Sequence, residues 1–124
     1  MKLTIDLPLP HEILHPNGRT RNHNYRAKLV KSARRTAELL AVVEWWKSKW
    51  KTCKQAEYTL TFYLPRKHDQ DGLIAWVKPY LDGLADAGVI EIDSGFALKE
   101  VRQITGKAAT GKRGVVITVE VINE

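Results

Sequence analysis

Acidic side chains collect between Asp69 and Asp93 in a chain whose overall charge is positive. Asp69 and Asp71 are two residues apart and follow a strand-like segment, so in extended chain both carboxylates point the same way and offer hard oxygens to one cation. Lys78 and Asp82 lie seven and eleven residues after Asp71, and steps of these sizes return to nearly the same face of a helix. The spacing therefore predicts a divalent metal site beside a lysine.

Phosphodiester hydrolysis is the chemistry that such a site would perform. Three carboxylates, Asp69, Asp71 and Asp93, can bind one or two Mg²⁺ ions, with Mn²⁺ as the alternative, and such ions activate water and stabilise the departing 3′ oxygen. Lys78, held beside anionic ligands, stays protonated and either adds a positive charge to the transition state or orients the attacking water.

Two functional alternatives and one structural alternative use the same residues. The protein could be a non-catalytic module that binds branched DNA, or a metal nuclease that acts on flaps or forks. In the structural alternative, Lys78 and Asp82 form an i,i+4 helix pair worth a few tenths of a kcal/mol, and the other acids are solvated. An EF-hand calcium loop is excluded because Leu73 and Tyr80 stand where that loop needs oxygen ligands.

In their order along the chain, these residues resemble the motifs of the RusA-type Holliday junction resolvases, the crossover junction endodeoxyribonucleases common in bacteria and their prophages. The resemblance rests on Asp69-x-Asp71, Lys78-Pro79-x-x-Asp82-Gly83-Leu84, Ala87-Gly88-Val89-Ile90 and Asp93-Ser94, with upstream matches at Leu7-Pro8-Leu9-Pro10 and Pro16-Asn17-Gly18-Arg19-Thr20. Family members usually carry Asn where this chain has Gly72, and often a second Asp where it has Ile92.

The resemblance implies one RusA-like endonuclease domain over residues 1–124. It implies Asp69, Asp71, Lys78 and Asp93 as catalytic residues, with the three aspartates as Mg²⁺ ligands and Asp82 and Glu91 supporting them. It also implies a homodimer in which each subunit cuts one strand of a four-way DNA junction during recombination and repair. Two-fold symmetry suits this task, because a two-fold substrate is cut symmetrically by a two-fold enzyme. The expected setting is the cytoplasm, with a bacterial or phage origin.

The distribution of charge supports a nucleic-acid partner. Residues 1–67 hold 14 Lys and Arg against 5 Asp and Glu, whereas residues 68–124 hold 6 against 9, which gives the net charge of +6. A basic half beside an acidic cluster suits an enzyme that gathers a phosphate backbone and holds ions that cut it. The cations that we expect to contact DNA are Arg19, Arg21, Arg26, Lys28, Lys31, Arg35, Arg66 and Lys67. His15 and His23 could also contact phosphates, but we interpret them as solvated loop histidines.

Hydrophobic periodicity predicts a single-domain α/β (α+β) fold. Alternating polarity predicts strands near residues 2–8, 55–64, 97–105 and 113–122, with the last two as a neighbouring pair. Helical patterns cover residues 25–50 and 71–88, and Pro79 predicts a kink near Lys78. The segment 11–24 shows no periodic pattern of hydrophobic residues, which predicts a loop that is mobile or becomes ordered on binding. We expect a mixed sheet with two main helices on one face.

Other features of the composition limit the possible functions. The chain has one cysteine, Cys53, so an intrachain disulfide is excluded. The paired cysteine spacing of a zinc site is also absent from the sequence. No apolar run is long enough to cross a bilayer and the first residues lack a secretory pattern, so we expect an intracellular protein with no membrane partner. Trp45, Trp46 and Trp50 fit the core or a dimer interface better than base stacking.

Overall fold

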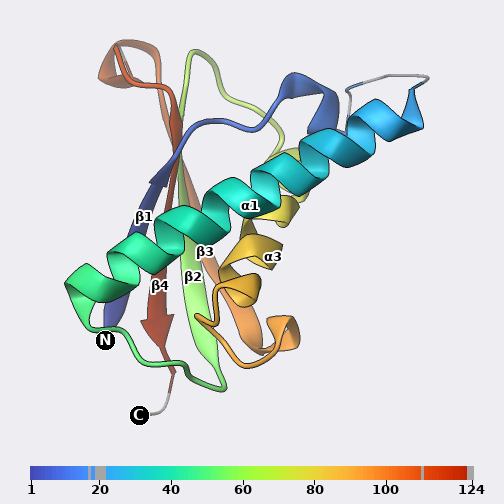
Figure 1. Cartoon of the computed structure of the whole chain (residues 1–124). Helices are drawn as coiled ribbons and strands as arrows, with labels where there is room; N and C mark the ends of the chain where they lie inside the picture. The colour runs from blue at the N-terminus through green and yellow to red at the C-terminus, as the bar shows by residue number, and fades with distance from the viewer. Residues whose placement is uncertain (17, 19–21, 110, 123–124) are drawn as a thin grey trace.

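The chain folds into a mixed four-stranded sheet with its helices on one face, the α+β arrangement predicted from the sequence (Figure 1). This computed structural model describes residues 1–16, 18, 22–109 and 111–122. The elements are β1 (Lys2–Leu7), η1 (Glu12–Leu14), α1 (His23–Ser48), β2 (Ala56–Leu64), α2 (Gln70–Trp76), α3 (Lys78–Asp86), η2 (Asp93–Gly95), β3 (Phe96–Thr105), η3 (Gly106–Ala109) and β4 (Gly114–Val121). Within these described ranges, no helix combines the length and the apolar character that crossing a membrane requires.

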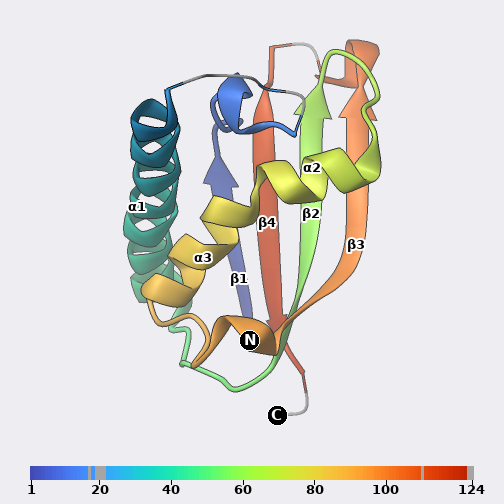
Figure 2. The ribbon, with the colours of Figure 1, turned by 90° about the vertical axis from the view of Figure 1, so that its right-hand side faces the viewer.

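The sheet has the strand order β1-β4-β2-β3, in which only β2 and β3 are parallel (Figure 2). The prediction that the last two strands pair was wrong, because β4 lies between β1 and β2 and does not pair with β3. Their side chains explain the difference. On β4, Val115, Ile117 and Val119 are fully buried, as a central strand requires, whereas β3 exposes Lys99 and Glu100, which suit an edge.

One face of the sheet forms the core. On β2 the burial alternates strictly, with Ala56, Tyr58, Leu60, Phe62 and Leu64 buried and the intervening residues partly exposed. This period of two places every second side chain against the helices and leaves the opposite face to solvent. The prediction that the helices lie on one face is therefore confirmed.

Helix α1 begins and ends close to the predicted positions. The Asn22 side chain accepts a hydrogen bond from the Tyr25 N–H at 3.0 Å and caps the first turn. Lys49 adopts a left-handed conformation (φ 57°) and ends the helix. After it, the buried Trp50 donates its indole N–H to the carbonyl of Val89 at 2.9 Å, which ties the end of α1 to the loop before η2.

The predicted break at Pro79 is present, as a boundary between α2 and α3. Val77 has φ −94° and ψ 3°, and α3 starts at Lys78 with Pro79 in its first turn, where a missing N–H is tolerated. The start of α2 differs from the prediction. Asp69, not Asp71, is the N-cap, because its Oδ2 accepts the Gly72 N–H at 3.2 Å.

Close backbone contact joins α1 to α3. A Cβ atom at Gly83 would lie 2.3 Å from the carbonyl oxygen of Arg34 and 2.9 Å from the Cβ of Ala37, so only glycine fits at this crossing. Arg34 also donates two hydrogen bonds to the Asp86 carboxylate, at 2.8 and 3.0 Å. The hydrogen bond to Asp86 raises the pKa of Arg34 above its ordinary value.

Candidate functional site

Asp69 and Asp71 lie where the chain leaves β2 and enters α2, as the sequence predicted. The preceding residue is fixed to the end of β3: His68 donates its N–H to the Gln103 side chain at 2.9 Å, and Gln103 donates back to the His68 carbonyl at 3.0 Å. Both aspartates are exposed. No ion pair joins either of them to a cation within the part of the chain that the structure describes.

His15 is a neighbour of this site that the sequence did not indicate. A Cβ atom built on Gly72 would lie 3.5 Å from His15 Nε2 and 3.8 Å from Asp69 Oδ2, so the imidazole and the carboxylate face one small space. The His15 ring packs edge-on against Trp76, with ring centroids 5.2 Å apart, and is half-buried. The interpretation of His15 as a solvated loop histidine was therefore wrong.

The loop before α1 is also more ordered than predicted in its described part. Residues Glu12–Leu14 form the short helix η1, and Leu14 is buried in the core. His11 lies at the start of this turn, and its carbonyl accepts the indole N–H of Trp76 at 3.0 Å. This packing holds His15 beside α2, and no period or motif in the sequence indicated it.

Lys78 and Asp82 form the predicted i,i+4 pair, with 2.6 Å between Lys78 Nζ and Asp82 Oδ1. The side chain of Lys78 is 60% exposed, so this ion pair contributes little to stability. Lys78 is the first residue of α3, beyond the break at Val77. The predicted break at Pro79 therefore lies between Asp71 and Lys78, so the two residues are not on one continuous helix.

Asp93 does not join Asp69 and Asp71, which corrects the predicted convergence of three aspartates. β2 and β3 are parallel, so the connection through α2 and α3 returns the chain to the start of β2, and Asp93 and Glu91 lie at that end. His68 donates a hydrogen bond to Gln103, which lies on β3 seven residues after Phe96, the first residue of that strand. Seven residues of extended strand span about 23 Å. The two acidic groups are thus separated by most of the length of the sheet (Figure 2).

Among the described residues, a magnesium site at this crossing would rest on the two carboxylates of Asp69 and Asp71. Within the described ranges, no three Asp, Glu, His or Cys side chains form a group that could hold a metal. Mg²⁺ is often bound through one or two carboxylates, with water and substrate phosphates as its other ligands. Asp69 and Asp71 can supply these two carboxylates, and both are hard oxygen donors at an exposed position.

The predicted DNA-contacting cations have different surroundings. Lys28, Lys31, Arg35, Arg66 and Lys67 reach solvent, whereas Arg26 donates to the Ile13 carbonyl and is thereby held against the segment before α1. Arg19 and Arg21 lie outside the described residues.

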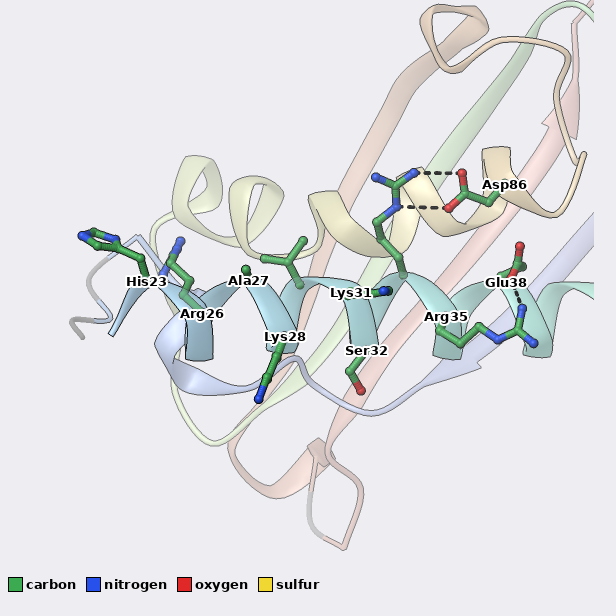
Figure 3. A pocket seen from close by; sticks show the side chains of 11 residues that line it. His23, Arg26, Ala27, Lys28, Lys31, Ser32, Arg35, Glu38 and Asp86 are labelled. Atoms are coloured by element: carbon green, nitrogen blue, oxygen red, sulfur yellow. Dashed lines mark hydrogen bonds and ion pairs between the residues drawn. The ribbon is translucent and has the colours of Figure 1, made fainter. Parts of the chain in front are cut away.

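The first half of α1 borders an open groove, lined by His23, Arg26, Lys28, Lys31, Arg35 and other residues. Figure 3 shows Lys28 and Arg35 on one side of this helix and Asp86, which accepts two hydrogen bonds from Arg34, on the other. Lys28, Lys31 and Arg35 therefore form an exposed basic surface on the first half of α1.

The tryptophans divide between core and surface. Trp50 is 2% exposed, which confirms the core alternative for this residue, while the neighbouring Trp46 is 82% exposed. Trp45 is partly buried against the core.

Comparison with known proteins adds one relative and no activity. No family model matches the chain. Over 87 residues the chain is 36% identical to an uncharacterized protein of Xylella fastidiosa (strain Temecula1 / ATCC 700964), and the match covers 68% of this chain and 56% of that protein. The chain thus spans little more than half the length of this curated relative.

Proposed function

We propose that the protein is a metal-dependent endodeoxyribonuclease that resolves four-way DNA junctions by paired, symmetric strand cleavage. The observation that carries this proposal is the pair Asp69 and Asp71, exposed at a strand-to-helix crossing and next to the exposed cations Arg66 and Lys67. The ordered motifs shared with the RusA-type resolvases also support it. In this proposal the protein acts as a homodimer on bacterial or phage DNA in the cytoplasm.

The chain's own residues would bind and position the substrate. Arg66 and Lys67 would hold a phosphate next to the carboxylates, and the basic half of α1 would hold neighbouring phosphates of the backbone. Asp69 and Asp71 would hold Mg²⁺, which supplies Lewis-acid stabilisation of the attacked phosphate and lowers the pKa of a bound water. Lys78, paired with Asp82 and still 60% exposed, can turn toward the substrate and add positive charge there.

The separation of Asp93 from the other two aspartates favours a second candidate, a branched-DNA-binding protein without catalysis. Two carboxylates remain solvated in that case, and the basic surface alone gathers DNA.

One assay separates the two candidates. The protein is incubated with a mobile four-way junction, a flap and a linear duplex, each with Mg²⁺ and with EDTA. Cleavage of the junction that requires Mg²⁺ and is absent with EDTA supports the nuclease. Binding of the junction without cleavage under both conditions supports the binding module, and preferential cleavage of the flap identifies a nuclease with a different substrate.

A further inference from the structure

The second half of α1 presents an apolar surface to solvent. Leu39, Val42, Val43 and Trp46 are 50%, 39%, 48% and 82% exposed, and their spacing of three, four and seven residues places them on one face of the helix. We call these four residues the outer stripe. Among the described residues, half of the large hydrophobic side chains that are exposed fall within these two helical turns.

The outer stripe does not serve the core of its own subunit. The core-facing side of the same helix carries Ala37 and Ala41, both fully buried, and α1 packs with this side on α3 and β1. Figure 2 shows α1 as the outermost layer on its side of the molecule. A helix that is apolar on two opposite faces needs a second neighbour, because contiguous apolar surface on soluble proteins marks an interaction site.

We propose that the outer stripe is the surface through which two copies of this chain associate, with their α1 helices antiparallel about a two-fold axis. The residues of the stripe are placed symmetrically about the point between Val42 and Val43. In a two-fold antiparallel contact centred there, Leu39 of one copy meets Trp46 of the other, and Val42 and Val43 lie beside the axis. Every apolar side chain of the stripe then meets an apolar one.

Local charge at the outer stripe also favours a second copy. The chain carries a net charge of +6, so two copies repel each other unless the contact is locally neutral. At the two ends of the stripe, Arg35 pairs with Glu38 and Lys47 pairs with Glu44. Within each copy these four charges cancel in pairs, and they place polar groups beside the apolar centre, as protein interfaces commonly do.

Other surfaces and other occupants fit less well. The exposed edge of β3 carries Lys99, Glu100 and Arg102, charges that hinder pairing with another strand. Nucleic acid requires cations, which lie on the first half of α1 and not within the stripe. A membrane surface is the competing occupant, because an exposed tryptophan beside lysines can also enter a lipid interface.

The size of the outer stripe predicts a dimer of moderate affinity. Its exposed apolar area is on the order of 400 Å² per copy, so two copies bury less than most stable complexes do. We expect a dissociation constant on the order of 10 µM, with subunits that exchange readily. The outer stripe would be the contact surface of the homodimer in the proposed function, and the proposal rests on that function to this extent. Its test uses neither DNA nor metal. A failure to dimerise can therefore be distinguished from a failure to cleave DNA.

Sedimentation equilibrium from about 1 to about 500 µM tests the proposal directly. The wild-type chain should change from monomer to dimer with concentration, and Trp46→Ser should weaken the dimer by at least about 30-fold, because each copy contributes this residue once to a small interface. Leu98→Ser is the matched control: it removes an exposed apolar side chain of β3 and should leave the dissociation constant unchanged. Trp46 is largely exposed, so its loss should not affect folding, which circular dichroism verifies.

A cross-linking experiment tests the two-fold geometry. In a Cys53→Ser chain, Val42→Cys places two thiols beside the proposed axis, and a short bismaleimide should link them, whereas Ile92→Cys should give no dimer above background.

A monomer at every concentration, or a dimer unaffected by Trp46→Ser, would overturn the proposal. Co-sedimentation of the monomer with phosphatidylcholine–phosphatidylglycerol vesicles, abolished in Trp46→Ser, would assign the stripe to a membrane instead.

Discussion

Asp71 and Lys78 carry opposite charges, and the proposed nuclease uses both. Asp71→Asn keeps the size of the side chain but removes its charge, so we expect junction cleavage to fall at least about 100-fold. Binding of the junction without metal should persist or tighten, because one charge that repels the phosphate is gone. Cleavage of a labelled junction and fluorescence anisotropy in EDTA measure the two effects. Asp6→Asn, an exposed change on β1, is the control.

Lys78→Ala should also reduce cleavage, but with weaker binding, because a cation is removed. Opposite effects on binding distinguish a catalytic role of Asp71 and Lys78 from a structural one. If both variants cleave junctions at the wild-type rate and only melt at lower temperature, the pair is structural.

Tyr80 makes stability depend on pH in the alkaline range. Burial raises the pKa of Tyr80 to about 12, and its hydroxyl donates to the Pro8 carbonyl at 2.6 Å. The unfolded chain ionises this phenol near its usual pKa of about 10. The contribution of the protonated Tyr80 side chain to the free energy of unfolding is therefore fully present below a pH of about 10, and it is lost as the pH rises from about 10 to about 12. Urea unfolding of the wild type and of Tyr80→Phe should show a steeper alkaline loss for the wild type; equal slopes would contradict this.

The candidate site shows which residue positions a sequence can indicate. The position of Asp69 and Asp71 at the strand-to-helix crossing was predicted correctly, because both follow directly from the end of β2. The expectation that both stand in extended chain was wrong for Asp71, which lies within α2. Asp93 was placed wrongly, because its position depends on β2 and β3 being parallel. His15 was missed because its neighbour Gly72 is 57 residues away, and no pattern connects them.

At the scale of the elements, the crossing of α1 and α3 depends on Gly83. Gly83→Ala would place a methyl group 2.3 Å from a backbone oxygen of α1, so the two helices must separate, and we expect a loss of about 1–3 kcal/mol in the free energy of unfolding. Gly72→Ala is the matched control: it also lies in a helix, but its added Cβ meets only ordinary contacts. Denaturant unfolding should show no loss for Gly72→Ala, and a neutral Gly83→Ala would show that the crossing can relax.

The basic half of α1 should determine the salt dependence of DNA binding. Replacing Lys28, Lys31 and Arg35 together with Gln removes exposed charges. The slope of log K against log salt should fall by roughly one unit for each phosphate that the variant no longer neutralises, while the melting temperature stays nearly constant. Lys99→Gln on β3 should change the slope little. An unchanged slope in the triple variant would mean that this face of α1 is merely solvated.

Element positions followed closely from local patterns. Alternation located all four strands, and Pro79 located the break between α2 and α3. The helix was predicted to start at Asp71, one residue after its start at Gln70, because only the hydrogen bond from the Gly72 N–H to Asp69 shows which aspartate caps it. The neighbours of β3 and β4 could not be inferred from alternation, since it gives the buried face of a strand and not its partner.

For the molecule as a whole, composition and periodicity predicted the α+β class and the single helical layer. They did not predict the exposed stripe of α1. Leu39, Val42, Val43 and Trp46 belong to a long helix that is apolar in sequence on more than one side, and only the packing of Ala37 and Ala41 shows which side is buried.

The central place of β4 has a consequence for how the chain reaches this structure during synthesis. β1 is made first, yet its sheet neighbour is the last strand, with Lys2 opposite Glu120. Forming this pair closes a loop of almost the whole chain, which is slow, and β1 has no strand to pair with until β4 has emerged from the ribosome. In pulse-labelled hydrogen exchange during refolding, amides of β1 and β4 should gain protection together and after those of α1. Protection of β1 while β4 is still open would contradict this order.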